Sequence, residues 1–143
     1  MENNVVVAVC GGLQRAGIAT LRFNMRSVDD DAKLLEANGE DLMDAYAFCG
    51  AQGFERVGLV AYSWSSMVAW HVMRSERPPR LAALALVAPP LDAARDAVEG
   101  TTGDTFEAFL ERHEKPLLIC LGEFDEYCRA DLVEDAADSV GQG

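Results

Sequence analysis

The chain has 143 residues, half of them hydrophobic, and carries a formal net charge of −12. This length suits a single domain over residues 1–143 with a real core, and so apolar a chain is unlike a disordered one. An acidic chain without a basic stripe repels phosphate backbones and anionic membrane surfaces, so we expect neither nucleic acid nor membranes as partners.

The cysteine pattern indicates a reducing compartment. Cys10, Cys49, Cys120 and Cys128 include no C-x-x-C pair and no histidine at metal-ligand spacing. Three of them sit in apolar runs, which is typical of buried free thiols. The first residues lack the basic start of a signal peptide, and no apolar run approaches the length of a membrane span. We therefore expect a soluble, cytoplasmic protein without a metal or another cofactor.

The first half of the chain is divided by glycines. Residues 3–16 combine strand composition with helical spacing of their apolar residues, and Gly17 ends them. Residues 18–24 have the composition of a strand. Residues 26–38 show no clean period and predict a loop with at most a turn of helix. Residues 40–49 have one apolar face and an acidic start, which predict a helix.

The second half alternates strands with helices. In chain order we predict a strand–turn–helix unit over 56–74, a strand over 81–87, an irregular surface segment over 91–103, a short helix through 106–110, a strand over 116–122 and a helix over 129–138. Thr102, Asp104 and Thr105 are the candidate caps of the short helix. This alternation predicts the α/β class, with a mainly parallel sheet of about four strands flanked by helices. In such sheets the chemistry lies beyond the carboxyl ends of the strands.

A serine stands where the strand of the 56–74 unit gives way to its helix, in Ala61-Tyr62-Ser63-Trp64-Ser65. A sharp turn at this point lifts the hydroxyl above the sheet edge, and the helix N-terminus offers N–H groups to a developing oxyanion. The usual pattern is G-x-S-x-G, and here the small residues Ala61 and Ser65 replace both glycines. The same stretch also fits a plain helix cap made by one of its serines.

Several further segments of the sequence, taken together with this turn, occur in the same order as in a known protein family. They are AGIATLRFNMR (16–26), GED (39–41), VAYSWS (60–65), LVAPP (86–90) and KPLLICLGEFDE (115–126). Together they resemble the small, lidless branch of the α/β-hydrolase superfamily, which is related to dienelactone hydrolases and serine aminopeptidases, and they cover most of the chain. The resemblance implies Ser63 as nucleophile, Asp125 as the acid of a Ser-Asp-His triad and the Trp64 backbone N–H as one oxyanion donor. It also implies that residues 3–16 form a helix.

The chain departs from that family in three ways. The serine turn is altered, and Arg26-Ser27-Val28-Asp29-Asp30-Asp31 replaces a glycine-rich loop. By the resemblance, the chain is also truncated at both ends. The strands expected before the first helix, with the second oxyanion donor, are not found, nor is the strand and loop that carries the catalytic histidine after the last helix. An open, apolar strand edge invites self-association.

Neither histidine of the sequence is placed to act as the missing base. His71 follows Ser63 by eight residues, which is roughly 12 Å along a helix. His113 precedes a strand and is therefore expected near the opposite edge of the sheet. Without a base a serine is a weak nucleophile.

Two functions follow as hypotheses. The first is hydrolysis of a small-molecule ester, thioester or small amide through an acyl-Ser63 intermediate. The alternative is a catalytically inactive hydrolase-fold fragment or a protein-interaction subunit that lacks the catalytic histidine. A flavodoxin-like binding domain has no support, because no acidic cluster ends the first strand and no glycine-rich phosphate loop follows one.

Overall fold

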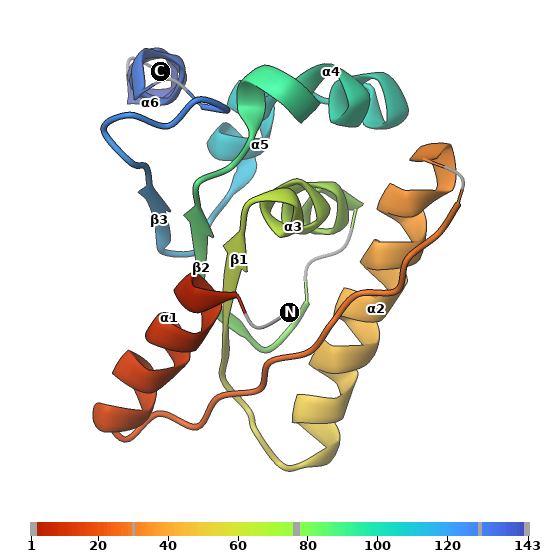
Figure 1. Cartoon of the computed structure of the whole chain (residues 1–143), viewed down its shortest axis with the longest axis vertical. Coiled ribbons are helices and arrows are strands. Elements are labelled where there is room, and N and C mark those ends of the chain that lie inside the picture. The colour runs from red at the N-terminus through yellow and green to blue at the C-terminus, as the bar shows by residue number, and fades with distance from the viewer. Residues whose placement is uncertain (1–2, 30, 76–77, 129, 142–143) are drawn as a thin grey trace.

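The computed structural model of the chain describes residues 3–29, 31–75, 78–128 and 130–141. The elements are α1 (Asn4–Arg15), α2 (Asp31–Ala51), β1 (Val57–Tyr62), α3 (Trp64–Ser75), β2 (Leu81–Val87), α4 (Leu91–Thr102), α5 (Phe106–Arg112), β3 (Leu117–Cys120) and α6 (Ala130–Gly141). Figure 1 shows the sheet at the centre, with α2 and α3 to one side and α1 at the other. The α/β class is thereby confirmed, as is the helix over the first segment.

The sheet has three parallel strands in the order β1-β2-β3 within the described residues. The prediction of about four strands is wrong because residues 18–24 form an irregular connection instead of a strand. Strand composition alone does not make a strand, which needs a neighbour to accept its ladder hydrogen bonds. Here the Ile18 N–H donates to the Leu13 carbonyl at 3.0 Å, and the Thr20 hydroxyl accepts from Gln14 at 2.8 Å. This connection is therefore tied to α1.

Helix α2 is longer than the sequence pattern suggested. It begins at Asp31, so the loop predicted over 26–38 is wrong for its last residues. The buried stripe of α2 includes Asn38 and Gly39 between Leu35 and Leu42, and these two residues hide the apolar period. Gly39 has a packing role, because a Cβ atom there would lie only 3.2 Å from a methyl group of Val72 on α3.

The core lies between one face of the sheet and helices α3, α4 and α5. Leu84 and Leu86 of β2 are buried there against Trp70 of α3, which is fully buried. The Trp70 ring meets Phe106 edge-on at 5.3 Å between centroids, and Phe106 stacks on Phe109 at 6.0 Å. Burial of three aromatic side chains makes this cluster a large contributor to stability.

Helix α4 replaces the irregular segment predicted over 91–103. Leu91, Ala94 and Val98 form its buried stripe, and polar residues on its other faces concealed the helical period. The predicted short helix is confirmed as α5, and Thr105 caps it by accepting a hydrogen bond from the Ala108 N–H at 3.2 Å.

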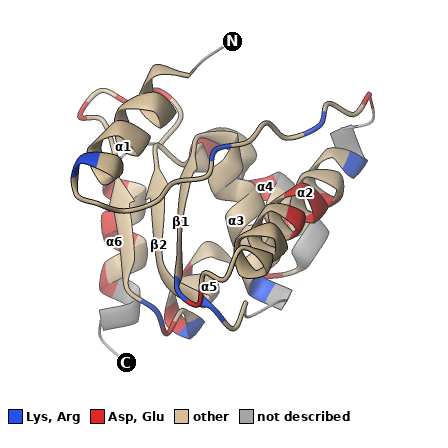
Figure 2. Ribbon diagram, turned by 90° about the horizontal axis from the view of Figure 1, so that it is seen from below, with Lys and Arg blue, Asp and Glu red and all other residues tan. Residues whose placement is uncertain are grey.

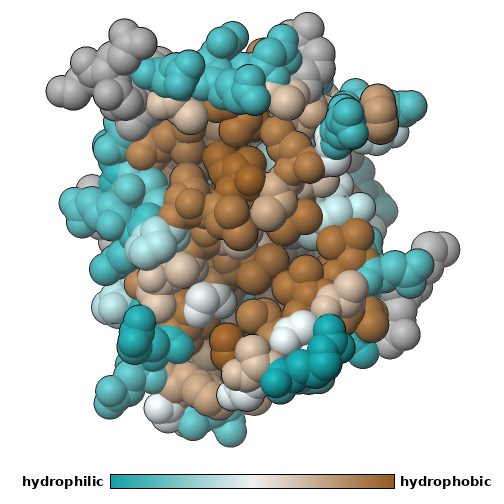
Figure 3. Space-filling view, turned by 90° about the vertical axis from the view of Figure 1, so that its left-hand side faces the viewer, coloured by the Kyte–Doolittle hydropathy of each residue, from teal (hydrophilic) through white to brown (hydrophobic). Residues whose placement is uncertain are grey.

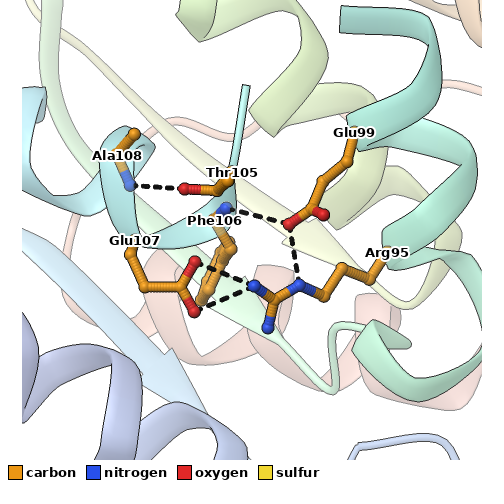
Figure 4. Close-up of polar contacts among 6 residues, drawn as sticks. All are labelled: Arg95, Glu99, Thr105, Phe106, Glu107 and Ala108. Atoms are coloured by element: carbon orange, nitrogen blue, oxygen red, sulfur yellow. Dashed lines mark hydrogen bonds and ion pairs between the residues drawn. The ribbon is translucent and has the colours of Figure 1, made fainter. Parts of the chain in front are cut away.

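An ion-pair network joins α4 to α5, as Figure 4 shows. The Arg95 guanidinium donates to Glu99 at 2.7 Å and to both carboxylate oxygens of Glu107 at 2.9 and 2.8 Å. Glu99 also accepts from the Phe106 N–H at 3.4 Å. The network therefore fixes the turn between the two helices above the aromatic cluster.

The opposite face of the sheet is poorly covered. Val60, Ala85 and Leu118 are aligned across the three strands and point to the same side. Val60 and Leu118 are both exposed. None of the described helices has the length and apolar character that crossing a membrane requires.

Candidate functional site

Ser63 occupies the turn between β1 and α3, and its backbone is in the left-handed region with φ of 54°. An L-residue with a side chain rarely adopts this conformation, which costs roughly 1–2 kcal/mol. Positive φ at this position turns the chain sharply from strand to helix. The serine is thereby placed at the carboxyl end of β1 and at the N-terminus of α3.

The three serines of this turn have different hydrogen bonds. Ser65 Oγ accepts from the Tyr62 N–H at 2.7 Å and donates to the Tyr62 carbonyl at 2.8 Å, whereas Ser66 Oγ donates to the Ala61 carbonyl at 3.0 Å. These two hydroxyls hold the turn together. The Ser63 hydroxyl has no hydrogen-bond partner within the described part of the chain. Neither the Ser65 nor the Ser66 hydroxyl accepts from an N–H of the first turn of α3, so neither bond is the helix cap that the sequence also allowed.

Backbone hydrogen bonds align the carboxyl ends of all three strands. The Ser63 N–H donates to the Val87 carbonyl at 2.9 Å, and the Ala88 N–H donates to the Cys120 carbonyl at 2.8 Å. Ala88 also has positive φ, at 46°. The turns after β1 and β2 are therefore neighbours, and each contains a residue with a strained backbone. No sequence pattern predicted positive φ at Ala88, since glycine or asparagine is the usual residue there.

Asp125 lies in the loop that follows β3, at the same edge of the sheet as Ser63. Its carboxylate accepts from the Tyr127 N–H at 2.9 Å, and its own N–H donates to the Gly122 carbonyl at 3.2 Å. These bonds give Asp125 a defined place in the loop. Because β2 separates β1 from β3, the strands that lead to the two residues are about 10 Å apart. A bridging group is needed for the two side chains to act together.

Cys128 is buried beside this loop. Burial raises the pKa of its thiol, and the negative charges of Asp125, Asp92 and Asp131 raise it further, although a hydrogen bond with the Leu91 backbone lowers it. A thiol with a raised pKa is a poor nucleophile. All four cysteines are free, but only Cys128 is buried and the others are half-buried, so the expected burial of most of them is wrong.

A polar chain links Trp64 to the segment before α2. The Trp64 indole N–H donates to Asn38 Oδ1 at 3.1 Å, and the Asn38 amide donates to the Arg26 carbonyl at 3.0 Å. Arg26 in turn binds Asp41 through its backbone N–H and its guanidinium, each at 2.7 Å. The hydrogen bond to Arg26 holds the pKa of Asp41 below its usual range. Asn38 was missed from the sequence, where it lies in a segment without a helical period.

His71 lies between α3 and α2 and is turned away from Ser63. It lines a pocket of about 360 Å³ with Glu36, Asp44 and other α2 residues. Burial lowers its pKa, the Arg74 charge lowers it further, and Glu36 opposes both. Its Nδ1 atom is buried without a hydrogen-bond partner in the described structure. His71 is thus part of the contact between α2 and α3.

His113 lies at the other edge of the sheet, as the sequence predicted. It ends α5 and lines a small pocket with Lys115, which precedes β3, and with Leu81, the first residue of β2. Burial lowers its pKa, and its ring lies 5.4 Å from that of Phe109. Neither histidine of the chain therefore stands at the carboxyl ends of the strands.

The arrangement provides a serine hydroxyl at a helix N-terminus, a loop carboxylate at the same edge and no imidazole between them. Within the described residues, no group of three or more His, Cys, Asp and Glu side chains could hold a metal ion. Comparisons with protein-family models, with curated proteins and with solved structures found no match for this chain. The geometry of the serine turn is therefore the main observation that bears on the function.

Proposed function

We propose that this chain is an α/β-hydrolase-like domain whose reaction is hydrolysis of a small-molecule ester, thioester or small amide at Ser63. The observation that carries the proposal is the backbone of Ser63, held at φ of 54° between a parallel strand and the helix that follows it. A serine in this strained turn presents its hydroxyl beyond the sheet edge. A helix cap has no need of such strain, since caps ordinarily have extended backbone.

In the proposed reaction the Ser63 hydroxyl oxygen attacks the carbonyl carbon of the substrate and loses its proton to a base. The N–H of Trp64, the first residue of α3, donates to the oxyanion that forms. Collapse of this intermediate releases the protonated alcohol, thiol or amine and leaves acyl-Ser63. Water then attacks the acyl group and frees the serine. Asp125 would orient the imidazole of the base.

The base is the part that this chain does not provide at the site. His71 faces α2 and His113 lies at the opposite edge, so the proposed reaction needs an imidazole other than these two. This same observation favours a second candidate function. In that case the hydrolase-like domain is catalytically inactive and acts by binding a protein partner.

Labelling of the purified, folded chain by a fluorophosphonate distinguishes the two functions. If Ser63 is activated, the wild-type chain is labelled and Ser63→Ala is not. Ser65→Ala serves as the matched control, since Ser65 is two residues away and its hydroxyl is already bonded to Tyr62. Addition of free imidazole should then accelerate the labelling of Ser63, because it supplies the absent base. If the folded chain stays unlabelled even with imidazole, the hydrolase proposal fails and the binding function is favoured.

A further inference from the structure

The contact between α2 and the serine turn contains a polar side chain at a position where an apolar one would be expected. Asn38 is 2% exposed and stands in the buried stripe of α2 between Leu35 and Leu42. Burial of an amide costs free energy that burial of a leucine does not, unless the polar atoms of the amide are hydrogen-bonded. Packing alone would therefore be served better by leucine, and asparagine here indicates a need for its hydrogen bonds.

The buried polar side chains of the described residues are concentrated at the serine turn. Leaving aromatic residues and cysteine aside, the described part of the chain buries two polar side chains, Asn38 and Ser66. Ser66 donates to the Ala61 carbonyl at 3.0 Å, and Asn38 accepts from the Trp64 indole N–H at 3.1 Å. Ala61 precedes Ser63 by two residues, and Trp64 follows it directly. Both buried polar groups therefore bond to residues that enclose Ser63.

The orientation of the Asn38 amide is fixed by its two partners. An indole N–H can only donate and a backbone carbonyl can only accept, so the amide oxygen must face Trp64 and the amide nitrogen must face the carbonyl of Arg26. The structure has this orientation, with the amide nitrogen 3.0 Å from the Arg26 carbonyl oxygen. An aspartate could not donate to the carbonyl, and a leucine could form neither bond. The position is therefore matched to a carboxamide.

Arg26 is a fixed acceptor for this amide because it is itself bound to α2. Its backbone N–H and its guanidinium both donate to Asp41 at 2.7 Å. Figure 2 shows basic residues on the connection that leads from α1 to α2, and acidic residues on α2. The Arg26 backbone is thus bonded through its N–H and through its carbonyl. The Asn38 side chain is therefore held from below by α2 and by this connection.

Asn38 adds a restraint that the sheet does not provide. The hydroxyls of Ser65 and Ser66 and the N–H of Ser63 bond the turn to β1 and β2. Ser63 has positive φ, which is costly for a residue with a side chain. The bond between Asn38 and Trp64 ties the same turn to α2, on the side of α3 that Figure 1 shows facing away from the sheet strands. The first turn of α3 is therefore held from two directions.

The uncovered apolar side of the molecule has no part in this arrangement. Figure 3 shows hydrophobic residues over the side that carries α1 and β3, whereas Figure 1 places α2 at the other side. The hydrogen bonds of Asn38 are all made to residues of this chain. Their effect on Ser63 can therefore be measured on the chain alone.

We propose that Asn38 is a positioning residue for the reaction at Ser63. By holding the Trp64 indole against α2, it keeps the Trp64 backbone N–H directed at the oxyanion that forms on the substrate. An oxyanion donor accelerates the reaction only while it stays within hydrogen-bond reach of that oxygen, so a small rotation of Trp64 weakens it. This inference rests on the function proposed for Ser63, because it assigns a role within that reaction.

The rate of fluorophosphonate inactivation tests this role. The phosphoryl oxygen gains negative charge as the Ser63 oxygen attacks phosphorus and fluoride leaves, so the reaction needs the same N–H donor. In the presence of free imidazole, Asn38→Leu should lower the maximal inactivation rate, kinact, at least about tenfold. The inhibitor concentration that gives half this rate, KI, should change less than about twofold, because Asn38 acts through Trp64 and does not touch the inhibitor.

Two further variants show whether Asn38 acts through Trp64. Trp64→Phe removes the indole N–H and should slow inactivation as Asn38→Leu does. The double variant should be slower than either single variant by no more than about twofold, because both changes break the same hydrogen bond. Leu35→Val alters the same buried stripe without touching this bond, so it is the control that should leave kinact unchanged. Cooperative unfolding confirms that each variant is folded.

The outcomes separate this inference from the function on which it rests. A wild-type chain that stays unlabelled overturns both. A labelled wild-type chain, with Asn38→Leu as reactive as Leu35→Val, keeps the hydrolase function and overturns the role of Asn38. Effects of Asn38→Leu and Trp64→Phe that multiply in the double variant also overturn that role, since two changes that break one bond cannot act independently.

Discussion

The region from β1 to α5 and the region from α1 to residue 29 are both rich in apolar residues, yet they use them differently. In the first region Trp70, Phe106 and Leu86 are fully buried, whereas no described residue of α1 is buried. The apolar residues of α1 are therefore available for contacts outside this chain. Apolar composition therefore stabilises a fold only where the sheet and its helices can enclose it.

The largest effect on stability should come from Trp70, at the centre of the buried region. Trp70→Ala should lower the free energy of unfolding by about 3–5 kcal/mol, because it removes a fully buried ring and leaves a cavity. Urea unfolding measures this loss. Trp70→Phe should cost less than half as much, since it keeps a ring and removes an indole N–H that has no hydrogen-bond partner within the described residues. A loss below about 1 kcal/mol for the alanine variant would contradict the statement that the region from β1 to α5 contains the stabilising core.

A smaller effect is expected at the polar boundary of the same region. Arg95→Met should lower the free energy of unfolding by about 1–2 kcal/mol at pH 7, because it breaks the partly buried bonds to Glu99 and Glu107. Arg112→Met, which removes a single ion pair that a more exposed arginine makes with Asp104, is the matched control and should cost less than Arg95→Met.

The same network should make stability depend on pH. Burial by itself raises the pKa of Glu107, but hydrogen bonds from its own backbone N–H and from Arg95 outweigh burial and hold that pKa below its usual value. The lowered pKa contributes stability that is present above the ordinary carboxyl pKa of about 4.5 and is lost as the pH falls through the folded-state value. Urea unfolding between about pH 7 and about pH 3 should show this loss of stability in the wild type and a smaller loss in Arg95→Met. An equal acid dependence in both proteins would rule out the contribution.

A gain in stability is expected at the strained turns. Ser63→Gly and Ala88→Gly should each raise the free energy of unfolding by about 0.5 kcal/mol, because glycine adopts positive φ without strain and this outweighs its greater entropy in the unfolded chain. Thermal unfolding measures the gain. Fluorophosphonate labelling should be lost in Ser63→Gly and retained in Ala88→Gly, which separates strain from chemistry. Destabilisation by Ser63→Gly would mean that the hydroxyl supports the turn.

The smallest effect is expected in α1. Val7→Ala should change the free energy of unfolding of the monomer by no more than about 0.5 kcal/mol, because Val7 is exposed and alanine is the better helix former. The measurement needs dilute protein, so that association does not contribute. A loss of more than about 1 kcal/mol would show that α1 is part of the core after all, and the comparison between the two regions would fail.

Local patterns in the sequence predicted the strands and helices from residue 57 onward with the exception of α4, because buried apolar runs and amphipathic periods lie within single segments. It also indicated Ser63 and Asp125 as candidates at one edge of a parallel sheet, and it placed His113 at the other. These conclusions need only the order of the elements, since parallel strands all end at the same edge.

The remaining features of the fold and the site depend on contacts between residues that are far apart in the sequence. Residues 18–24 have strand composition but no neighbouring strand, and Asn38 completes the stripe of α2 only when Trp64 provides a hydrogen-bond donor. The Ser63 backbone at positive φ is tied to the neighbouring strand by the hydrogen bond from its N–H to the Val87 carbonyl. Likewise, the valines of α1 do not by themselves predict that the helix stays unburied, because the burial of a segment depends on the whole fold.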